Sequence, residues 1–208
     1  MGAMLTVVTL LWQPNRRSRS FSRMYDEKWV ERLYRGFARN LTVPFRFVCF
    51  TDRSYQFQEP IEQVDDSSLG QGGYGDCIRA YQVPGPMILV GLDTVVTGNC
   101  DHLAHYCETA KVQALPRDPY HPHIACNGVA LVPAGWTKIA TSHRGENDME
   151  WVRKFPHRYL DDEFPGSVQS YKGHVEKNGI GDTAIVYFHG ERKPHQLPAG
   201  HPILEHWI

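Results

Sequence analysis

Short apolar runs alternate along the chain with amphipathic segments, which is the pattern of an α/β protein. The clearest apolar runs are residues 5–12 and 87–92, and each predicts a buried strand of a parallel sheet. From Asp26 to Asn40, apolar positions recur at helical spacing behind an N-cap residue, Asp26. A second strand is predicted over 45–50, so the chain begins as a β-α-β unit.

The same alternation continues as far as residue 155 and ends with one more strand after residue 182. Further strands are predicted over 111–115, 128–132 and 183–188, and short helices over 76–83, 101–106 and 148–155. Residues 156–182 are rich in Gly, Pro and His and are predicted to be loops. We therefore predict one α/β domain over residues 4–208, with a mixed, mostly parallel central sheet flanked by helices. Residues 1–3 are interpreted as a remnant of cloning.

The composition is that of an ordinary globular domain. Of the 208 residues, 41% are hydrophobic and 22% are charged, which excludes a disordered, collagen-like or coiled-coil protein. No apolar run reaches the roughly 18 residues of a membrane span, and the first run lacks the flanks of a signal peptide. We expect a cytoplasmic protein, or one of the host cytoplasm if a phage encodes it. The sequence does not indicate an oligomeric state.

Charge is unevenly distributed, although the net charge is only −1. Residues 12–46 carry nine Lys and Arg against three acids, a local net charge of +6 that leaves −7 for the remainder. The basic stretch 16–39 suits phosphate groups or an anionic acceptor, and it equally suits a solvated helix face and loop.

Five cysteines occur without a C-x-x-C pair, so reduced and mostly buried thiols are expected rather than a disulfide framework. Cys100, His102, His105 and Cys107 are crowded enough to suggest zinc, but their spacing is not that of a zinc finger. A zinc protein is therefore the least favoured alternative.

Polar residues follow the predicted strands at the edge of the sheet where ligands bind in α/β folds. Asp93 follows the strand 87–92, Asp52 follows the strand 45–50, and His189 follows the last strand. A carboxylate and an imidazole suit Mn²⁺ or Mg²⁺. Lys193 lies four residues after His189, close enough to reach a diphosphate on the same ion. A departing diphosphate needs such help because its negative charge grows as it leaves.

Several segments together resemble the GT-A-fold glycosyltransferases, and most of all the family 8 group of the glycogenin and lipopolysaccharide galactosyltransferase type. Residues 88–98, ILVGLDTVVTG, resemble the family's LDLDTVV-G segment, and residues 188–194, FHGERKP, resemble its H-x-x-G-x-x-K-P segment. Residues 45–52, 126–132, 147–152 and 170–172 resemble further family segments in the same order. The resemblance covers essentially the whole chain and implies a GT-A, Rossmann-like domain of a small bacterial or phage enzyme.

The resemblance implies transfer of a hexose from UDP-glucose or UDP-galactose to an acceptor hydroxyl, with a metal ion and with retention at the anomeric carbon. It implies that Asp93 and His189 bind Mn²⁺ or Mg²⁺, and that Lys193 and the backbone of Gly190 hold the diphosphate of the UDP-sugar. Strict alignment puts Tyr187 at the family's histidine, and we favour His189.

The remaining implied roles concern the base, the sugar and the acceptor. Thr9, Leu11 and Trp12, where the first strand ends, would line the base pocket. Asn127 and Asp148 would face the sugar and the acceptor, and they are the candidate catalytic residues.

Two positions depart from the family pattern. The first acid of the D-x-D motif is Gly91 here, so a carboxylate to the metal and ribose is missing, with Asp52 and Asp76 as candidate replacements. Cys77 stands where the family often has a lysine, with Arg79 as its candidate replacement. The alternative is therefore a degenerate protein without catalysis that binds a nucleotide sugar or serves as a scaffold. The acceptor is open among glycan, lipid, protein and a modified DNA base.

Overall fold

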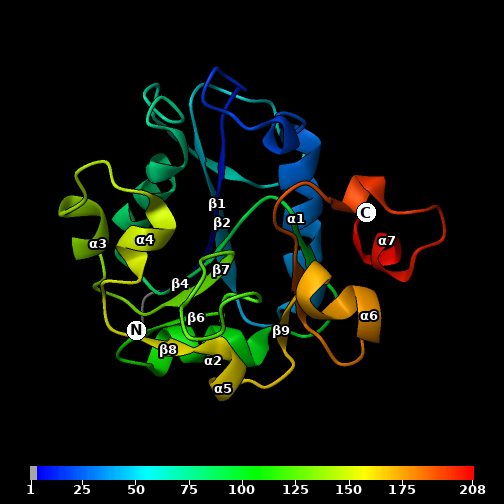
Figure 1. Ribbon diagram of the computed structural model, residues 1–208. Helices are drawn as coiled ribbons and strands as arrows, with labels where there is room; N and C mark the ends of the chain where they lie inside the picture. Colours follow the sequence, from blue (N-terminus) through cyan, green and yellow to red (C-terminus); the bar gives the residue numbers. More distant parts are fainter. Residues whose placement is uncertain (1–3) are drawn as a thin grey trace.

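The computed structural model describes residues 4–208 (Figure 1), so the interpretation of residues 1–3 lies outside it. Seven of the described strands form one sheet in the order β3-β2-β1-β4-β7-β6-β8. In chain order they are β1 (Leu5–Leu11), β2 (Phe45–Thr51), β3 (Glu62–Asp65), β4 (Met87–Val90), β6 (Gln113–Leu115), β7 (Val129–Val132) and β8 (His157–Tyr159). β1 is parallel to β2 and β4, whereas β7 is antiparallel to β4 and β6. The predicted mixed, mostly parallel sheet is confirmed.

The apolar run of β1 is continuous because both faces of this strand are covered. Leu5, Val7 and Leu11 pack in a core that includes residues of α1 (Glu27–Asn40) and α2 (Asp101–Thr109). Val8 and Leu10 pack in a second core on the opposite face, with the 3₁₀ helix Gly73–Gln82, α3 (Lys138–Thr141) and α4 (Asp148–Val152). Alternate residues of a strand point to opposite faces, so one apolar run supplies two cores.

A second, smaller sheet has the order β5-β10-β9. β10 (Ile185–Tyr187) lies in its centre, antiparallel to β5 (Thr94–Val96) and parallel to β9 (Val168–Ser170). Only residues 91–93 separate β4 from β5. Asp93 therefore lies where the chain passes from the large sheet to the small one, and this junction positions the site described below.

The prediction of loops over residues 156–182 is wrong. The segment contains β8, α5 (Leu160–Glu163), β9, a π-helical turn at Tyr171–Val175 and α6 (Glu176–Asn178). None of these elements exceeds five residues, so none is long enough to show a periodic pattern, and the Gly and Pro residues between them favour a loop prediction. The C-terminal segment follows with the 3₁₀ turn Pro194–Gln196 and α7 (Pro202–His206). None of the helices in residues 4–208 is long and apolar enough to cross a membrane.

Candidate functional site

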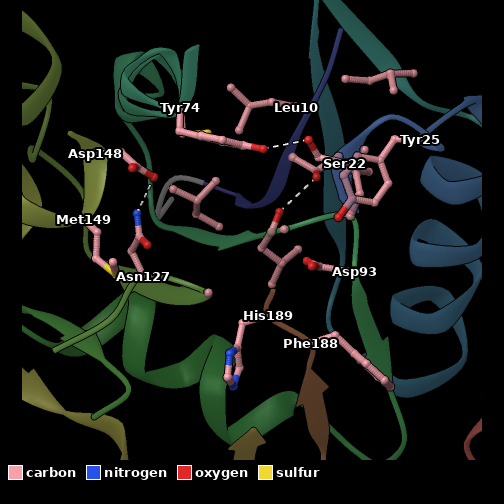
Figure 2. Close-up of a pocket in the computed structure, with 18 of the residues that line it drawn as sticks. Leu10, Ser22, Tyr25, Tyr74, Asp93, Asn127, Asp148, Met149, Phe188 and His189 are labelled. Carbon is pink, nitrogen blue, oxygen red and sulfur yellow. Dashed lines mark hydrogen bonds between the residues drawn. The ribbon is translucent and has the colours of Figure 1, made fainter. Parts of the chain in front are cut away.

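A cavity of about 400 Å³ lies at the carboxyl ends of β1 and β4. Its lining comes from these two strand ends, the segment before α1, the 3₁₀ helix 73–82, the two residues before β7, the start of α4 and the segment after β10. Figure 2 shows side chains from these separate elements converging on one space. This is the edge of the sheet where the sequence predicts ligand binding.

Nine of the eleven residues predicted for the site line this cavity, and two do not. The nine are Thr9, Leu11, Trp12, Asp93, Asn127, Asp148, His189, Gly190 and Lys193.

Asp52 and Arg79 do not line the cavity. The Asp52 carboxylate accepts a hydrogen bond from the Tyr55 hydroxyl at 2.8 Å, beyond the end of β2. Arg79 forms an ion pair with Asp66, and its Nε lies 3.5 Å from a carboxylate oxygen of Asp76. The candidate replacements for the missing acid and the missing lysine are thus engaged with local partners instead.

One wall of the cavity is aromatic. The rings of Trp12 and Tyr74 meet edge to face, with 6.4 Å between their centroids. The Tyr74 hydroxyl lies 2.6 Å from Ser22 Oγ (Figure 2). The Thr9 hydroxyl donates to the Val90 carbonyl at 2.9 Å. It therefore links β1 to β4 and is not available to a nucleotide base as a donor. The aromatic pair offers a surface for a flat ring, which is what the sequence predicts for Trp12.

Asp93 is the centre of a second group of side chains. Its carboxylate accepts hydrogen bonds from the Lys193 ammonium and from the Tyr25 hydroxyl. The Lys193 side chain is only 2% exposed, and an ammonium so deeply buried needs a negative partner. Burial, followed by the charge of Asp93, raises the pKa of Tyr25, so its phenol stays protonated and donates. Sequence reasoning missed Tyr25, because an aromatic residue next to a helix cap has the pattern of a core residue.

His189 and Gly190 follow β10 and form a third group. The imidazole Nε2 lies 2.9 Å from Ser170 Oγ, and the ring meets that of Tyr120 edge to face at 5.5 Å. Burial and the charge of Lys172 lower the pKa of His189, so the ring is neutral at neutral pH. Gly190 has a φ of +68°, and a Cβ there would lie 3.5 Å from the Lys172 Nζ. A second ammonium therefore lies beside Gly190, although Lys172 itself lines a neighbouring surface pocket and not the cavity.

The fourth group is a carboxylate with an amide. Asn127 Nδ2 donates to Asp148 Oδ2 at 2.8 Å (Figure 2). Asp148 is the first residue of α4, and the side chain of Asn147 caps this helix. Burial raises the pKa of the Asp148 carboxyl, and the hydrogen bond from Asn127 opposes part of that effect. A carboxylate with a raised pKa is suited to take up and release a proton.

The side chains around Asp93 and His189 do not form a site for Mn²⁺ or Mg²⁺. Within residues 4–208, no three His, Cys, Asp or Glu side chains are placed to share a metal ion. The Asp93 carboxylate is already held by Lys193 and Tyr25. A Cβ at Gly91 would lie 2.9 Å from Asp93 Oδ1, which marks where the missing acid would stand. Asp93 and His189 thus stay a predicted pair of ligands without the donors that complete a site.

The zinc alternative has no matching geometry either. Among the described residues, Cys100, His102, His105 and Cys107 do not form a group that could hold a metal ion. Both thiols lie in the core of the large sheet, and their Sγ atoms contact the carbonyls of Gly98 and Met87 at 3.4 and 3.2 Å. Burial raises the pKa of each thiol to about 12, so neither is a thiolate at neutral pH.

Comparison with known proteins identifies the fold of this chain but does not assign it to a sequence family. No family model matches the sequence, and no curated protein matches it. The fold is that of the GT-A glycosyltransferases, as the sequence predicts. The glycosyltransferase GlyE of Streptococcus pneumoniae superimposes with a TM-score of 0.59 at 14% identity, over 99% of this chain and 60% of GlyE. An active-site mutant of LgtC superimposes with a TM-score of 0.62 at 10% identity, over 96% of this chain and 93% of LgtC.

The apo form of GlyE gives the same picture, with a TM-score of 0.59 at 13% identity over 99% of this chain. The chain spans about 60% of the length of GlyE. Identities this low establish a shared fold, so activity and substrates are taken up as proposals.

Proposed function

We propose that this chain is a glycosyltransferase that moves a hexose from a UDP-sugar, UDP-glucose or UDP-galactose, to an acceptor hydroxyl. The observation that carries the proposal is the content of one cavity. At the ligand-binding edge of a GT-A fold, it holds an aromatic wall, a cationic end and a carboxylate with a raised pKa.

The donor takes its place along these groups. Its base packs against Trp12 and Tyr74, which form the aromatic wall. Its diphosphate lies at the end occupied by Lys193 and Gly190. An ammonium held in a buried position stabilises the negative charge that develops on the leaving diphosphate, and it does so without reorganising during the reaction.

Asp148 and Asn127 then act on the sugar and the acceptor. In the reaction, the bond from the anomeric carbon to the diphosphate oxygen breaks, and a bond to the acceptor oxygen forms. The acceptor hydroxyl loses its proton, and Asp148 is the group on this wall able to accept it. Asn127 orients the carboxylate through its 2.8 Å hydrogen bond. The resemblance to family 8 favours retention at the anomeric carbon, in which the acceptor attacks from the side that the diphosphate leaves and Asp148 takes the proton there. Attack from the opposite side with Asp148 as the base would give inversion, which is the less favoured alternative.

The metal that the resemblance implies would, when bound, neutralise the diphosphate. Asp93 and His189 are the residues predicted to hold it, and their surroundings do not fit that ion. No step of this proposal therefore passes through Mn²⁺ or Mg²⁺.

The acceptor remains a prediction. The basic stretch 16–39, which favours an anionic acceptor, falls into two halves that differ in their contacts. On α1, Arg35 and Arg39 donate to carbonyls of the C-terminal segment at 3.0 and 2.7 Å, and Arg32 stacks on Trp207. The helical half of the stretch therefore has a structural task. Arg17 and Arg19 lie beside the 3₁₀ helix that borders the cavity. An anionic acceptor would meet this second half.

Calorimetric titration with UDP, ADP and GDP tests the proposal, followed by incubation with UDP-glucose and UDP-galactose to detect released UDP. We expect selective binding of UDP and slow hydrolysis of one donor. Asp148→Asn should bind UDP as the parent does and release it from the donor ~10²–10⁴-fold more slowly. Binding without hydrolysis or transfer would favour the degenerate binding protein. Failure of all three nucleotides to bind would overturn the proposal.

A further inference from the structure

We propose that the donor site works without a divalent cation: Lys193 and Lys172 supply the positive charge that the diphosphate needs, and Asp93 is a positioning residue for Lys193 rather than a metal ligand. This inference rests on the proposed function and goes beyond it, because it assigns a different chemistry to the centre of the site.

The first observation is the way in which Lys193 is held. The Lys193 side chain is 2% exposed, and its ammonium donates to the Asp93 carboxylate. The neighbouring Tyr25 hydroxyl donates to the same carboxylate. Its backbone is fixed as well, since the Lys193 N–H donates to Gln196 Oε1 at 2.8 Å. Burial of an ammonium is tolerated only with such a partner. The carboxylate that would bind a metal is thus paired with a lysine and holds it in place.

The second observation is the glycine at position 91. A side chain at Gly91 would point at Asp93, because a Cβ there would lie 2.9 Å from Asp93 Oδ1. Two carboxylates in that space would repel each other unless a divalent cation lay between them. Gly91 therefore removes the acid that would need a divalent cation between itself and Asp93, and the remaining carboxylate pairs with the Lys193 ammonium instead.

The third observation is a second ammonium on the far side of Gly190. Lys172 Nζ lies 3.5 Å from the position of a Gly190 Cβ, and the charge of Lys172 acts on His189. The turn that carries Lys172 is tightly fixed, because the Gly173 N–H donates to Ser170 Oγ at 3.0 Å. A divalent cation at His189 would be repelled by this charge, whereas a diphosphate would be attracted by it.

UDP titration in EDTA and in Mn²⁺ separates the two chemistries. We expect the Kd for UDP to differ by less than twofold between the two buffers. Binding that is tenfold or more tighter with Mn²⁺ would overturn the inference and leave the proposed function standing. Absence of UDP binding in both buffers would overturn both.

Substitutions then assign the charge. Lys193→Met should weaken UDP binding tenfold or more in EDTA and leave uridine binding unchanged, since uridine lacks the phosphates. Lys172→Met should weaken UDP binding several-fold. Because the Lys172 side chain is only half-buried, we expect this variant to fold even if Lys193→Met does not. The matched control is Lys177→Met, on the exposed side of α6. Lys172 and Lys193 variants that bind UDP like this control would contradict the inference.

Asp93→Asn gives the sharpest distinction. A positioning residue affects UDP binding equally with and without Mn²⁺, so we expect the same loss in both buffers. A metal ligand would show its loss only in Mn²⁺, and that outcome would overturn the inference. Gly91→Asp should in turn make UDP binding respond to Mn²⁺, weakening it in EDTA and restoring it when the ion is added.

Discussion

At the scale of single residues, the cavity depends on side chains that hold one another in place. Gly70 is one of the residues that fix the aromatic wall without lining it. It has a φ of +82°, and a Cβ there would lie 2.4 Å from the Trp12 ring. The indole therefore rests directly on the Gly70 backbone, and its position depends on a residue without a side chain.

Gly70→Ala should displace the Trp12 ring and weaken UDP binding several-fold, because the base loses its surface. Gly200→Ala is the matched control, since Gly200 has the same φ of +82° and nothing within 4 Å of its Cβ position. Both variants carry the same backbone strain, and only Gly70→Ala should lose affinity in a calorimetric titration. Equal affinities for UDP in the two variants would contradict the role given to Trp12.

Asp148 connects stability with function. Because burial raises its pKa in the folded state, the folded chain binds this proton more tightly than the unfolded chain does. The ionised carboxylate therefore lowers the free energy of unfolding as pH rises above the unfolded value of about 3.9, and the loss is complete above the folded pKa. Asp148→Asn removes this cost and can keep the hydrogen bond with Asn127.

We expect Asp148→Asn to raise the melting temperature by a few degrees at pH 7.5 and to leave it unchanged near pH 3.5. Turnover should fall by ~10²–10⁴-fold, the usual effect of removing a general base. The exposed acid Asp182 provides the control, since Asp182→Asn should change neither quantity. A melting temperature that falls at pH 7.5 would contradict the cost assigned to the carboxylate.

At the scale of elements, the ends of strands and helices fix where the chemistry lies. α1 begins behind Asp26, whose carboxylate accepts from the backbone N–H groups of Lys28 and Trp29 at 3.0 and 3.3 Å. Tyr25, which donates to Asp93, is the residue immediately before this cap. The N-terminus of α1 thus connects the core of the large sheet with the centre of the cavity.

Asp26→Ala should cost about 1 kcal/mol in the free energy of unfolding, because two backbone donors lose their acceptor. Asp26→Ser keeps a side-chain acceptor and should cost much less. Denaturant titration of the two variants measures the difference. Equal stabilities of the alanine and serine variants would show that the cap contributes nothing.

At the scale of the whole molecule, the two sheets share one core. Val96, Val168 and Ile185 of the small sheet belong to the same buried cluster as Leu5 and Val7 of the large sheet. α1 and the C-terminal segment are joined in addition by the contacts of Arg35 and Arg39 with the last residues. A shared core is the physical basis for one cooperative unit.

Residues 4–208 should therefore unfold in one step, as the sequence predicts for a single domain. Denaturant curves followed by circular dichroism and by tryptophan fluorescence should coincide. Two separate transitions would show that the small sheet is an independent unit. Adding UDP should move the whole curve to higher denaturant, because ligand binding stabilises the folded state alone.

Sequence reasoning reached the fold and most of the cavity for a physical reason. Strands such as 5–11 and 87–90 are long apolar runs, and the residues that follow them must lie at one edge of a sheet. Asp52 follows such a strand too, but β2 lies next to the edge strand β3, away from the junction of the two sheets. Sequence distance gives no indication that Asp93 meets Lys193, since the two are 100 residues apart. The helices and strands within 156–182 could not be predicted, because they are too short to show a periodic pattern.

The position of β10 in the centre of the small sheet has a consequence for synthesis of the chain. β5 emerges from the ribosome early, yet its partner is completed only at residue 187, so residues 94–96 must wait with an unpaired edge. Most of the large sheet is complete by residue 132, long before the small one can form. Lys193 is made later still, after β10, so the cationic end of the cavity is the last part of it to be made. The proposed nucleotide can therefore stabilise the chain only after residue 193 has joined the cavity.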